Sequence, residues 1–100
     1  MFWTEAFINS RRAEWLNQIN KAQYCVDGVW QDAEITEKYI SSTGIKITTA
    51  MGEFSKKVKI SGIRFLNKDE EVVGEQSENL EILALQGIMS VWDFSIYETL

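Results

Sequence analysis

The chain has 100 residues with a formal net charge of −5. This length fits one domain around one core, and 45% hydrophobic with 25% charged residues is typical of a folded globular protein. The excess of acidic residues argues against a nucleic-acid partner, because the summed field of the chain repels phosphates.

Residues 1–23 are predicted to form a helical segment that packs on or beside a sheet. Apolar residues recur there at helical spacing: Ile8, Trp15, Leu16, Ile19 and Ala22. Thr4 is one candidate for the N-cap, and Asn9 or Ser10 would instead cap a shorter helix that begins at Arg11. Asp27-Gly28 ends the helical pattern.

Trp15 belongs to this apolar stripe, and so do Leu16 and Ile19. Burial of each large side chain is worth about 1.5 to 3 kcal/mol. The pattern therefore predicts that Trp15 and Trp92 are core residues, and that Trp15→Ala destabilises the whole domain.

After Gly28 the apolar period changes from 3.6 to 2, which indicates strands. One strand is predicted from Val29 to about Tyr39, followed by a turn at residues 41–44. A second runs over residues 45–51, where apolar and polar residues alternate cleanly. Residues 52–53 are the next turn.

A third strand is predicted from Val58, with a bulge at Ser61-Gly62, where the alternation slips by one residue. Residues 67–71 form a solvated hairpin turn, and Val72-Val73 starts the returning strand. Residues 74–79 are predicted to be a loop. Leu80–Leu85 fits a strand or a helical turn equally well.

The alternation returns from Ile88 onward. One face would carry Ile88, Ser90, Trp92, Phe94 and Ile96. The opposite face would carry Met89, Val91, Asp93, Ser95 and Tyr97. Apolar residues on both faces predict that this last strand is central in the sheet or covered.

Together these elements predict a mainly β (α+β) fold in a single domain, residues 1–100. An N-terminal amphipathic helix would be followed by a small antiparallel β-sandwich or half-open barrel of about six strands. The β-rich body is expected to span residues 29–100, and the helix to lie across an open end or against one face.

The composition disfavours catalysis. The chain contains no histidine, the side chain whose ordinary pKa lies nearest neutral pH, and no phosphate-binding loop. Its single cysteine, Cys25, has apolar neighbours and is expected to be a buried thiol. We therefore predict a protein that is not an enzyme, with no catalytic residue and no cofactor.

Clusters of carboxylates offer the other chemical options. Asp69, Glu70 and Glu71 could bind a hard cation, but Lys68 adjoins them and no calcium-loop pattern is present, so a solvated turn and no metal site are predicted. The pairs Glu34 with Glu37 and Glu75 with Glu78 are too close in sequence to suggest the two carboxylates of a glycosidase.

The location is expected to be cytoplasmic or virion-associated. A single cysteine cannot form an internal disulfide, and the first residues do not resemble a secretory signal peptide. No apolar run approaches the ~20 residues of a transmembrane segment.

Aromatic residues outside the predicted core are the candidate contacts with a partner. Tryptophan and the other aromatic side chains supply large, rigid contact areas at interfaces. Phe2, Trp3 and Phe7 form an aromatic segment that the domain does not need for its own core, so we expect it to dock on a neighbouring subunit. The candidate interface or binding residues are Phe2, Trp3, Phe7, Trp30, Tyr39 and Tyr97.

The order of elements resembles small β-rich proteins from the tail or baseplate region of tailed bacteriophages and prophages. The resemblance lies in the amphipathic helix, the strand–turn–strand segment Lys59–Phe65 through Val72-Val73-Gly74, and the closing aromatic strand Trp92–Tyr97. It implies a tail or baseplate component, or an accessory attachment protein, working as a ring or through a larger virion protein.

The leading hypothesis is a structural or adaptor subunit that acts through protein–protein contacts, by self-association or in a larger assembly. One alternative is a domain that binds carbohydrate or a host protein, with Trp30, Trp3 or Tyr39 as platforms. Another is a small acidic inhibitor of a host enzyme, with its carboxylates facing a basic groove. Neither nucleic acid nor a membrane is expected as a partner.

Overall fold

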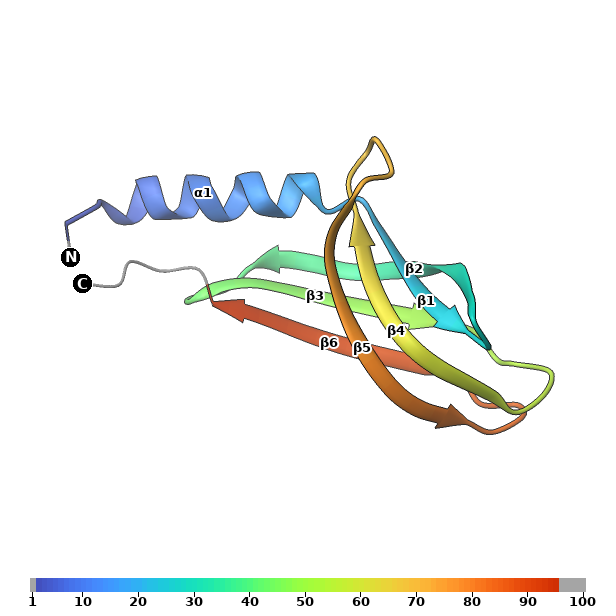
Figure 1. The fold of residues 1–100 in the computed structure, drawn as a ribbon. Helices are drawn as coiled ribbons and strands as arrows, with labels where there is room; N and C mark the ends of the chain where they lie inside the picture. The colour runs from blue at the N-terminus through green and yellow to red at the C-terminus, as the bar shows by residue number, and fades with distance from the viewer. Residues whose placement is uncertain (1, 96–100) are drawn as a thin grey trace.

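The computed structural model describes residues 2–95. One helix, α1 (Glu5–Gln18), precedes six strands: β1 (Lys21–Val26), β2 (Val29–Ile40), β3 (Gly44–Met51), β4 (Val58–Leu66), β5 (Val72–Ile82) and β6 (Ile88–Ser95). All pairings are antiparallel. The strand order is β5-β4-β1-β2-β3-β6. The sheet curls into a nearly closed, barrel-like form, and α1 extends beside β2 (Figure 1). The predicted fold class is confirmed.

The N-terminal segment differs from its prediction at one end. Thr4 is the N-cap and its hydroxyl accepts a hydrogen bond from the Phe7 amide at 3.2 Å, but the helix stops at Gln18, five residues early. Residues 21–26 form β1 instead. Ala22 and Tyr24 are fully buried. The spacing from Ile19 to Ala22 suits a helix, yet Ala22 and Tyr24 also alternate as a strand requires, and sheet pairing on both sides of β1 decides between them.

Asp27 and Gly28 join β1 to β2 in a two-residue hairpin. Their φ values are 49° and 85°, and positive φ at both central residues is the conformation that an Asp-Gly pair favours. The Asp27 amide donates to the carbonyl of Lys59 at 2.9 Å, and the Lys59 amide donates to the Asp27 carboxylate at 2.9 Å. The turn is therefore also attached to β4.

The predicted bulge at Ser61-Gly62 is confirmed. The register between β4 and β5 shifts between Ile60 and Gly62. Beyond the bulge, Ile63 and Phe65 take over the buried face from Val58 and Ile60, as the slipped alternation requires.

The predicted loop at residues 74–79 is wrong, because these residues lie within β5. Their polar sequence suggests a loop, but β5 is an end strand whose side chains are mostly exposed, so it needs no apolar pattern. Leu80–Leu85 divides at Ile82, where the strand ends. Residues 67–71 form the predicted hairpin turn.

The core lies between the facing sides of the curled sheet. One cluster contains Ile19, Ala22, Ile45, Ile47 and Phe65, with Trp92 and Phe94 packed against it. The other contains Tyr24, Val26, Val58, Ile60 and Ile63. Trp92 contacts both clusters, so its predicted core position is confirmed.

Candidate functional site

The two end strands, β5 and β6, border the side on which the barrel stays open. In residues 2–95 each has one sheet neighbour, β4 for β5 and β3 for β6. A strand edge without a neighbour presents amide and carbonyl groups that another chain can pair with. The chemistry at these edges therefore decides what the open side can contact.

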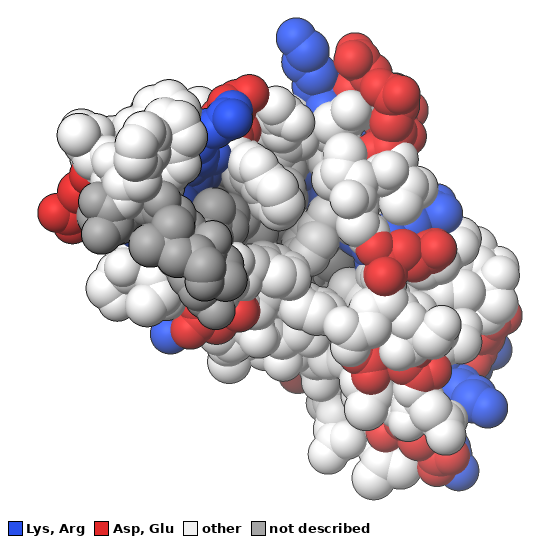
Figure 2. All heavy atoms as spheres, turned by 60° about the vertical axis from the view of Figure 1, so that its left-hand side comes forward, with Lys and Arg blue, Asp and Glu red and all other residues white. Residues whose placement is uncertain are grey.

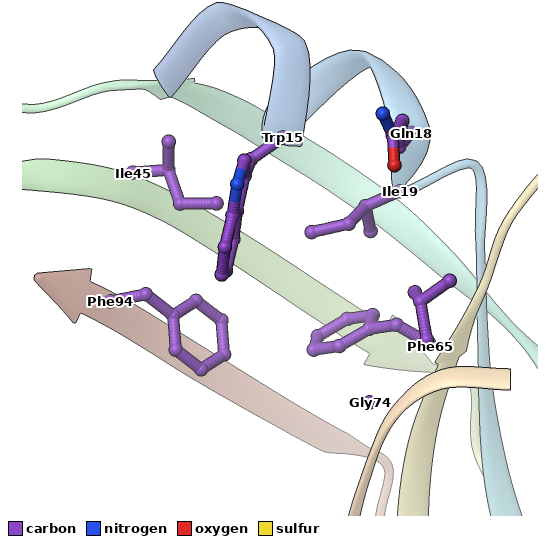
Figure 3. Close-up of a pocket in the computed structure, with 8 residues that line it drawn as sticks. Trp15, Gln18, Ile19, Ile45, Phe65, Gly74 and Phe94 are labelled. Atoms are coloured by element: carbon purple, nitrogen blue, oxygen red, sulfur yellow. The ribbon is translucent and has the colours of Figure 1, made fainter. Parts of the chain in front are cut away.

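An apolar pocket of about 240 Å³ opens at this side, under the last turns of α1. Its lining residues come from α1, β3, β4, β5 and β6 and from Ile19 just after the helix; Figure 3 shows the pocket. We call it the apolar pocket, and its lining is Trp15, Gln18, Ile19, Ile45, Phe65, Val73, Gly74 and Phe94.

Paired strands position the floor of the pocket. Ile45 of β3 stands directly opposite Phe94 of β6, so both side chains point to the same face of the sheet. The rings of Phe65 and Phe94 meet edge to face, with centroids 6.2 Å apart. Because Phe65 comes from β4, this contact spans the interior of the barrel.

Trp15 forms a wall of the pocket instead of filling the core. Its ring descends from α1 toward the space between Ile45 and Phe94 (Figure 3), yet the residue is 57% exposed. The prediction of a buried Trp15 is therefore wrong. Trp15 belongs to the apolar stripe and faces Ile45 and Phe94, but it lies at the pocket, where the barrel is open between β5 and β6.

β6 is an edge strand, which corrects the prediction of a central or covered position. The alternation itself is confirmed for residues 88–95. Ile88, Ser90, Trp92 and Phe94 are half-buried, whereas Met89 is 70% and Val91 57% exposed. The apolar residues on the outer face, which suggested a covered strand, are uncovered in the single chain.

The two edges differ in charge. β5 carries Glu75, Glu78 and Glu81, whereas the charged residue of β6 is Asp93. Figure 2 shows acidic side chains along the right-hand side of this face, where β5 lies. Charged side chains protect an edge against pairing, so β6 is the less protected edge.

Phe2, Trp3 and Phe7 lie together at the start of α1, as their predicted common role requires. The ring centroids are 4.7 Å apart for Phe2 and Trp3, and 5.1 Å for Trp3 and Phe7. All three side chains are exposed, Phe2 to 76%. We call this group the aromatic cluster.

The other candidate contact residues do not join this cluster. Trp30 lies at the opposite end of β2 from Tyr39, about 30 Å away at ~3.3 Å per residue. The Arg64 guanidinium covers the Trp30 ring at 4.1 Å. Tyr39 is exposed. Tyr97 and Ile96 lie outside the described residues.

The 67–71 turn is shaped by Asn67, and two of its three carboxylates, those of Glu70 and Glu71, accept hydrogen bonds, from Lys21 and Asn67. The Asn67 side-chain oxygen accepts hydrogen bonds from the amides of Asp69 and Glu71, each at 3.0 Å. Lys21 donates to Glu70 at 3.0 Å. This hydrogen bond, and then the negative charges of Asp32 and Glu70, raise the pKa of Lys21. Among residues 2–95 no three potential ligands are grouped to hold a metal ion.

A small polar group is buried inside the barrel. The Tyr24 hydroxyl lies 2.7 Å from the Thr49 hydroxyl, and it donates to the Ser90 hydroxyl at 3.1 Å. The Trp92 indole nitrogen is buried without a hydrogen-bond partner among the described residues. Cys25 is a buried free thiol, as expected.

Sequence reasoning missed the apolar pocket. Ile45, Phe65 and Phe94 each read as ordinary inward residues of separate strands, and this part is right. That they line one pocket follows from the strand order, which leaves the barrel open beside them. No local pattern indicates that order.

The fold and the site define a small, nearly closed antiparallel barrel with a helix beside its opening. Comparison with protein families, curated proteins and solved structures finds no match for this chain. Within residues 2–95, α1 is too short and too polar to span a membrane.

Proposed function

We propose that this chain is a structural or adaptor subunit, not an enzyme, that assembles with protein neighbours, copies of itself included, through the free edge of β6. The observation that carries the proposal is the contrast between the two end strands. β5 is protected by three glutamates, whereas β6 offers an edge with one charge and exposed Met89 and Val91. A strand added to such an edge gains main-chain hydrogen bonds and apolar contact.

The apolar pocket adds to this proposal by its size. A volume of 240 Å³ falls below the roughly 300 Å³ at which pockets for small organic ligands begin. It exceeds the ~150 Å³ of a cavity that holds one benzene ring. A single side chain of a partner protein therefore suits it better than a separate ligand does.

Two contacts bear on the alternative binding roles. A sugar platform needs an aromatic face open to a ring, and Arg64 covers one face of Trp30, one of the three candidate platforms. In the turn that would offer Asp69–Glu71 to a basic groove, the carboxylates of Glu70 and Glu71 already accept hydrogen bonds from Lys21 and Asn67. A virion tail or baseplate is the setting we propose, on the resemblance described above, with a cytoplasmic or virion-associated location.

The solution mass of the chain, measured by light scattering over a wide concentration range, tests this function. We expect multiples of 11.5 kDa that Val91→Lys abolishes, because a charge on the edge disfavours pairing. Val29→Lys is the matched control, since Val29 is also exposed, to 61%, but lies on β2. A parent chain that remains at 11.5 kDa at every concentration would contradict the proposal.

A further inference from the structure

The outer face of β6 carries its one carboxylate beside a lysine of the neighbouring strand. Lys46 of β3 stands directly opposite Asp93, and Thr48 stands opposite Val91. Side chains in such pairs lie on the same face of the sheet and interact. On the side away from β3, no strand among residues 2–95 pairs with β6. A partner strand added there would therefore lie beside Asp93, Val91 and Met89.

Charge distinguishes the two strand edges that a second copy offers to β6. The β5 edge would bring Glu75, Glu78 and Glu81 beside Asp93, and neither strand has a lysine or arginine. Like charges that face each other across two strands are destabilising. The β6 edge carries Asp93 alone, and an antiparallel register separates the two Asp93 side chains. The charges therefore favour β6 of a second copy over its β5.

Symmetry limits how two β6 strands pair through the same edge. Antiparallel strands are then related by a two-fold axis perpendicular to the sheet, and the outer faces of both copies lie on the same side. Outer residues therefore stand opposite outer residues, and inner residues opposite inner ones. Within Ile88–Ser95, the two longest overlaps that meet this condition place either Val91 or Trp92 on the axis.

The outer residues favour the axis at Val91. There the two Val91 side chains face each other, a pair that suits a sheet surface. Met89 faces Asp93 of the second copy, so each Asp93 lies between Lys46 of its own chain and a methionine. With Trp92 on the axis, each Val91 would face a carboxylate instead, and the outer face would have no apolar pair.

We propose that β6 pairs with β6 of a second copy in antiparallel orientation, with Val91 on the two-fold axis and Met89 opposite Asp93. The contact is isologous, because the same edge serves in both copies, so it produces a closed dimer with one sheet running through both. This inference rests on the proposed function, since it names the partner and the register at the same edge.

Two substitutions at Met89 test this register through charge. Met89 is 70% exposed, so the fold should accept either. Met89→Lys places a cation opposite Asp93 of the second copy, whereas Met89→Glu places another carboxylate there. We expect Met89→Glu to associate about tenfold more weakly than Met89→Lys in light scattering over a dilution series. Val29→Lys and Val29→Glu make the same changes in net charge on β2 and should associate alike. Equal association of the two Met89 variants would contradict the register.

Cysteine crosslinking measures the register directly, in a chain whose single cysteine, Cys25, is replaced by alanine. Val91→Cys should crosslink to itself, because the axis brings the two positions to about 5 Å. Met89→Cys and Asp93→Cys should crosslink only when mixed. Within each of these variants the two cysteines lie about 13 Å apart along the strands, so the crosslinker must be shorter than that. Val29→Cys, exposed on β2, is the matched control and should remain uncrosslinked.

The outcomes separate this inference from the proposed function. If the parent assembles and Val91→Lys prevents this, but Val91→Cys does not crosslink to itself, the edge of β6 contacts another surface. The proposed function then stands and this inference is wrong. Crosslinking of Val91→Cys with Asp93→Cys in place of the expected pairs would put Trp92 on the axis, and the proposed register is equally wrong. A parent that stays monomeric overturns both.

Discussion

Lys38 closes the end of the helix from the neighbouring strand: its Nζ donates a hydrogen bond to the carbonyl of Ile19 at 2.9 Å. A second bond reaches the carbonyl of Leu16 at 3.1 Å. The last carbonyls of a helix have no partners within the helix, and a cation there is also favoured by the helix dipole. One side chain of β2 thus fixes the helix to the sheet.

Replacing Lys38 by methionine should therefore loosen the helix. Methionine retains the apolar stem but leaves both carbonyls to water, at a cost of about 1 kcal/mol for an exposed pair of bonds. Urea unfolding measures the loss. Lys56→Met, in the exposed loop before β4, is the control and should change the free energy of unfolding little. Equal stabilities of the two variants would show that packing of Leu16 and Ile19 alone holds the helix.

The buried hydroxyls of Tyr24 and Thr49 give a second prediction. Tyr24→Phe leaves the Thr49 hydroxyl without its 2.7 Å partner, and an unsatisfied buried hydroxyl costs about 1 to 3 kcal/mol. Thr49→Val should cost less, because the Tyr24 hydroxyl still donates to Ser90 at 3.1 Å. The double variant should cost less than the sum of the two, because no hydroxyl of the pair is then left alone. Additive losses in urea unfolding would show that the two hydroxyls do not act as a pair.

Much of this fold is readable from alternation, and the errors have a common cause. The strict alternation of residues 45–51 and 88–95 and the slip at Gly62 each identify buried faces correctly, since one-sided burial imposes period two. The predictions for β1 and β5 are wrong because whether these segments form strands depends on pairing with strands far away in the sequence. Tyr24 belongs to the centre of the sheet, whereas residues 74–79 lie at its edge, where polar side chains are acceptable.

The candidate site is less predictable than the fold. Phe2, Trp3 and Phe7 are close in sequence near one helix end and their rings lie together, but their role as contact residues stays a prediction. The exposure of Trp15 and the pocket beneath it depend on the strand order, which places β5 and β6 at the two ends of the sheet and leaves the barrel open there. Both are properties of the assembled sheet.

Gly62 gives a third prediction, through its contact with Trp30. A Cβ at position 62 would lie 2.9 Å from the Trp30 ring. That ring cannot easily move away, because Arg64 stacks on it and is itself bound to Gln23 at 2.9 Å. Gly62→Ala should therefore destabilise the fold by roughly 1 to 3 kcal/mol, as overpacking does.

The background Trp30→Ala separates this contact from other effects of the alanine. There the new methyl has room on the ring side, so Gly62→Ala should become nearly neutral in thermal unfolding. Gly52→Ala, which adds a methyl in open space, is the control in the parent background. Persistence of the full loss in the Trp30→Ala background would attribute the cost to the β4 backbone instead.

Lys21 gives a prediction of pH dependence. Its hydrogen bond to Glu70 and the charges of Asp32 and Glu70 raise its pKa above the ordinary 10.5. When folding raises the pKa of a group, that group stabilises the folded protein fully at every pH below its pKa in the unfolded state. This contribution is lost as the pH rises through its pKa in the folded state. The stability difference between the parent and Lys21→Met should therefore be constant from neutral pH to about 10.5 and shrink above it.

Urea unfolding of both chains at a series of pH values measures this difference, because groups that both chains share contribute equally to each. With Glu70→Gln in both chains the acceptor of the Lys21 bond is neutral and the charge of Glu70 is gone, so the alkaline loss should diminish. An unchanged loss would assign it to a group other than Lys21.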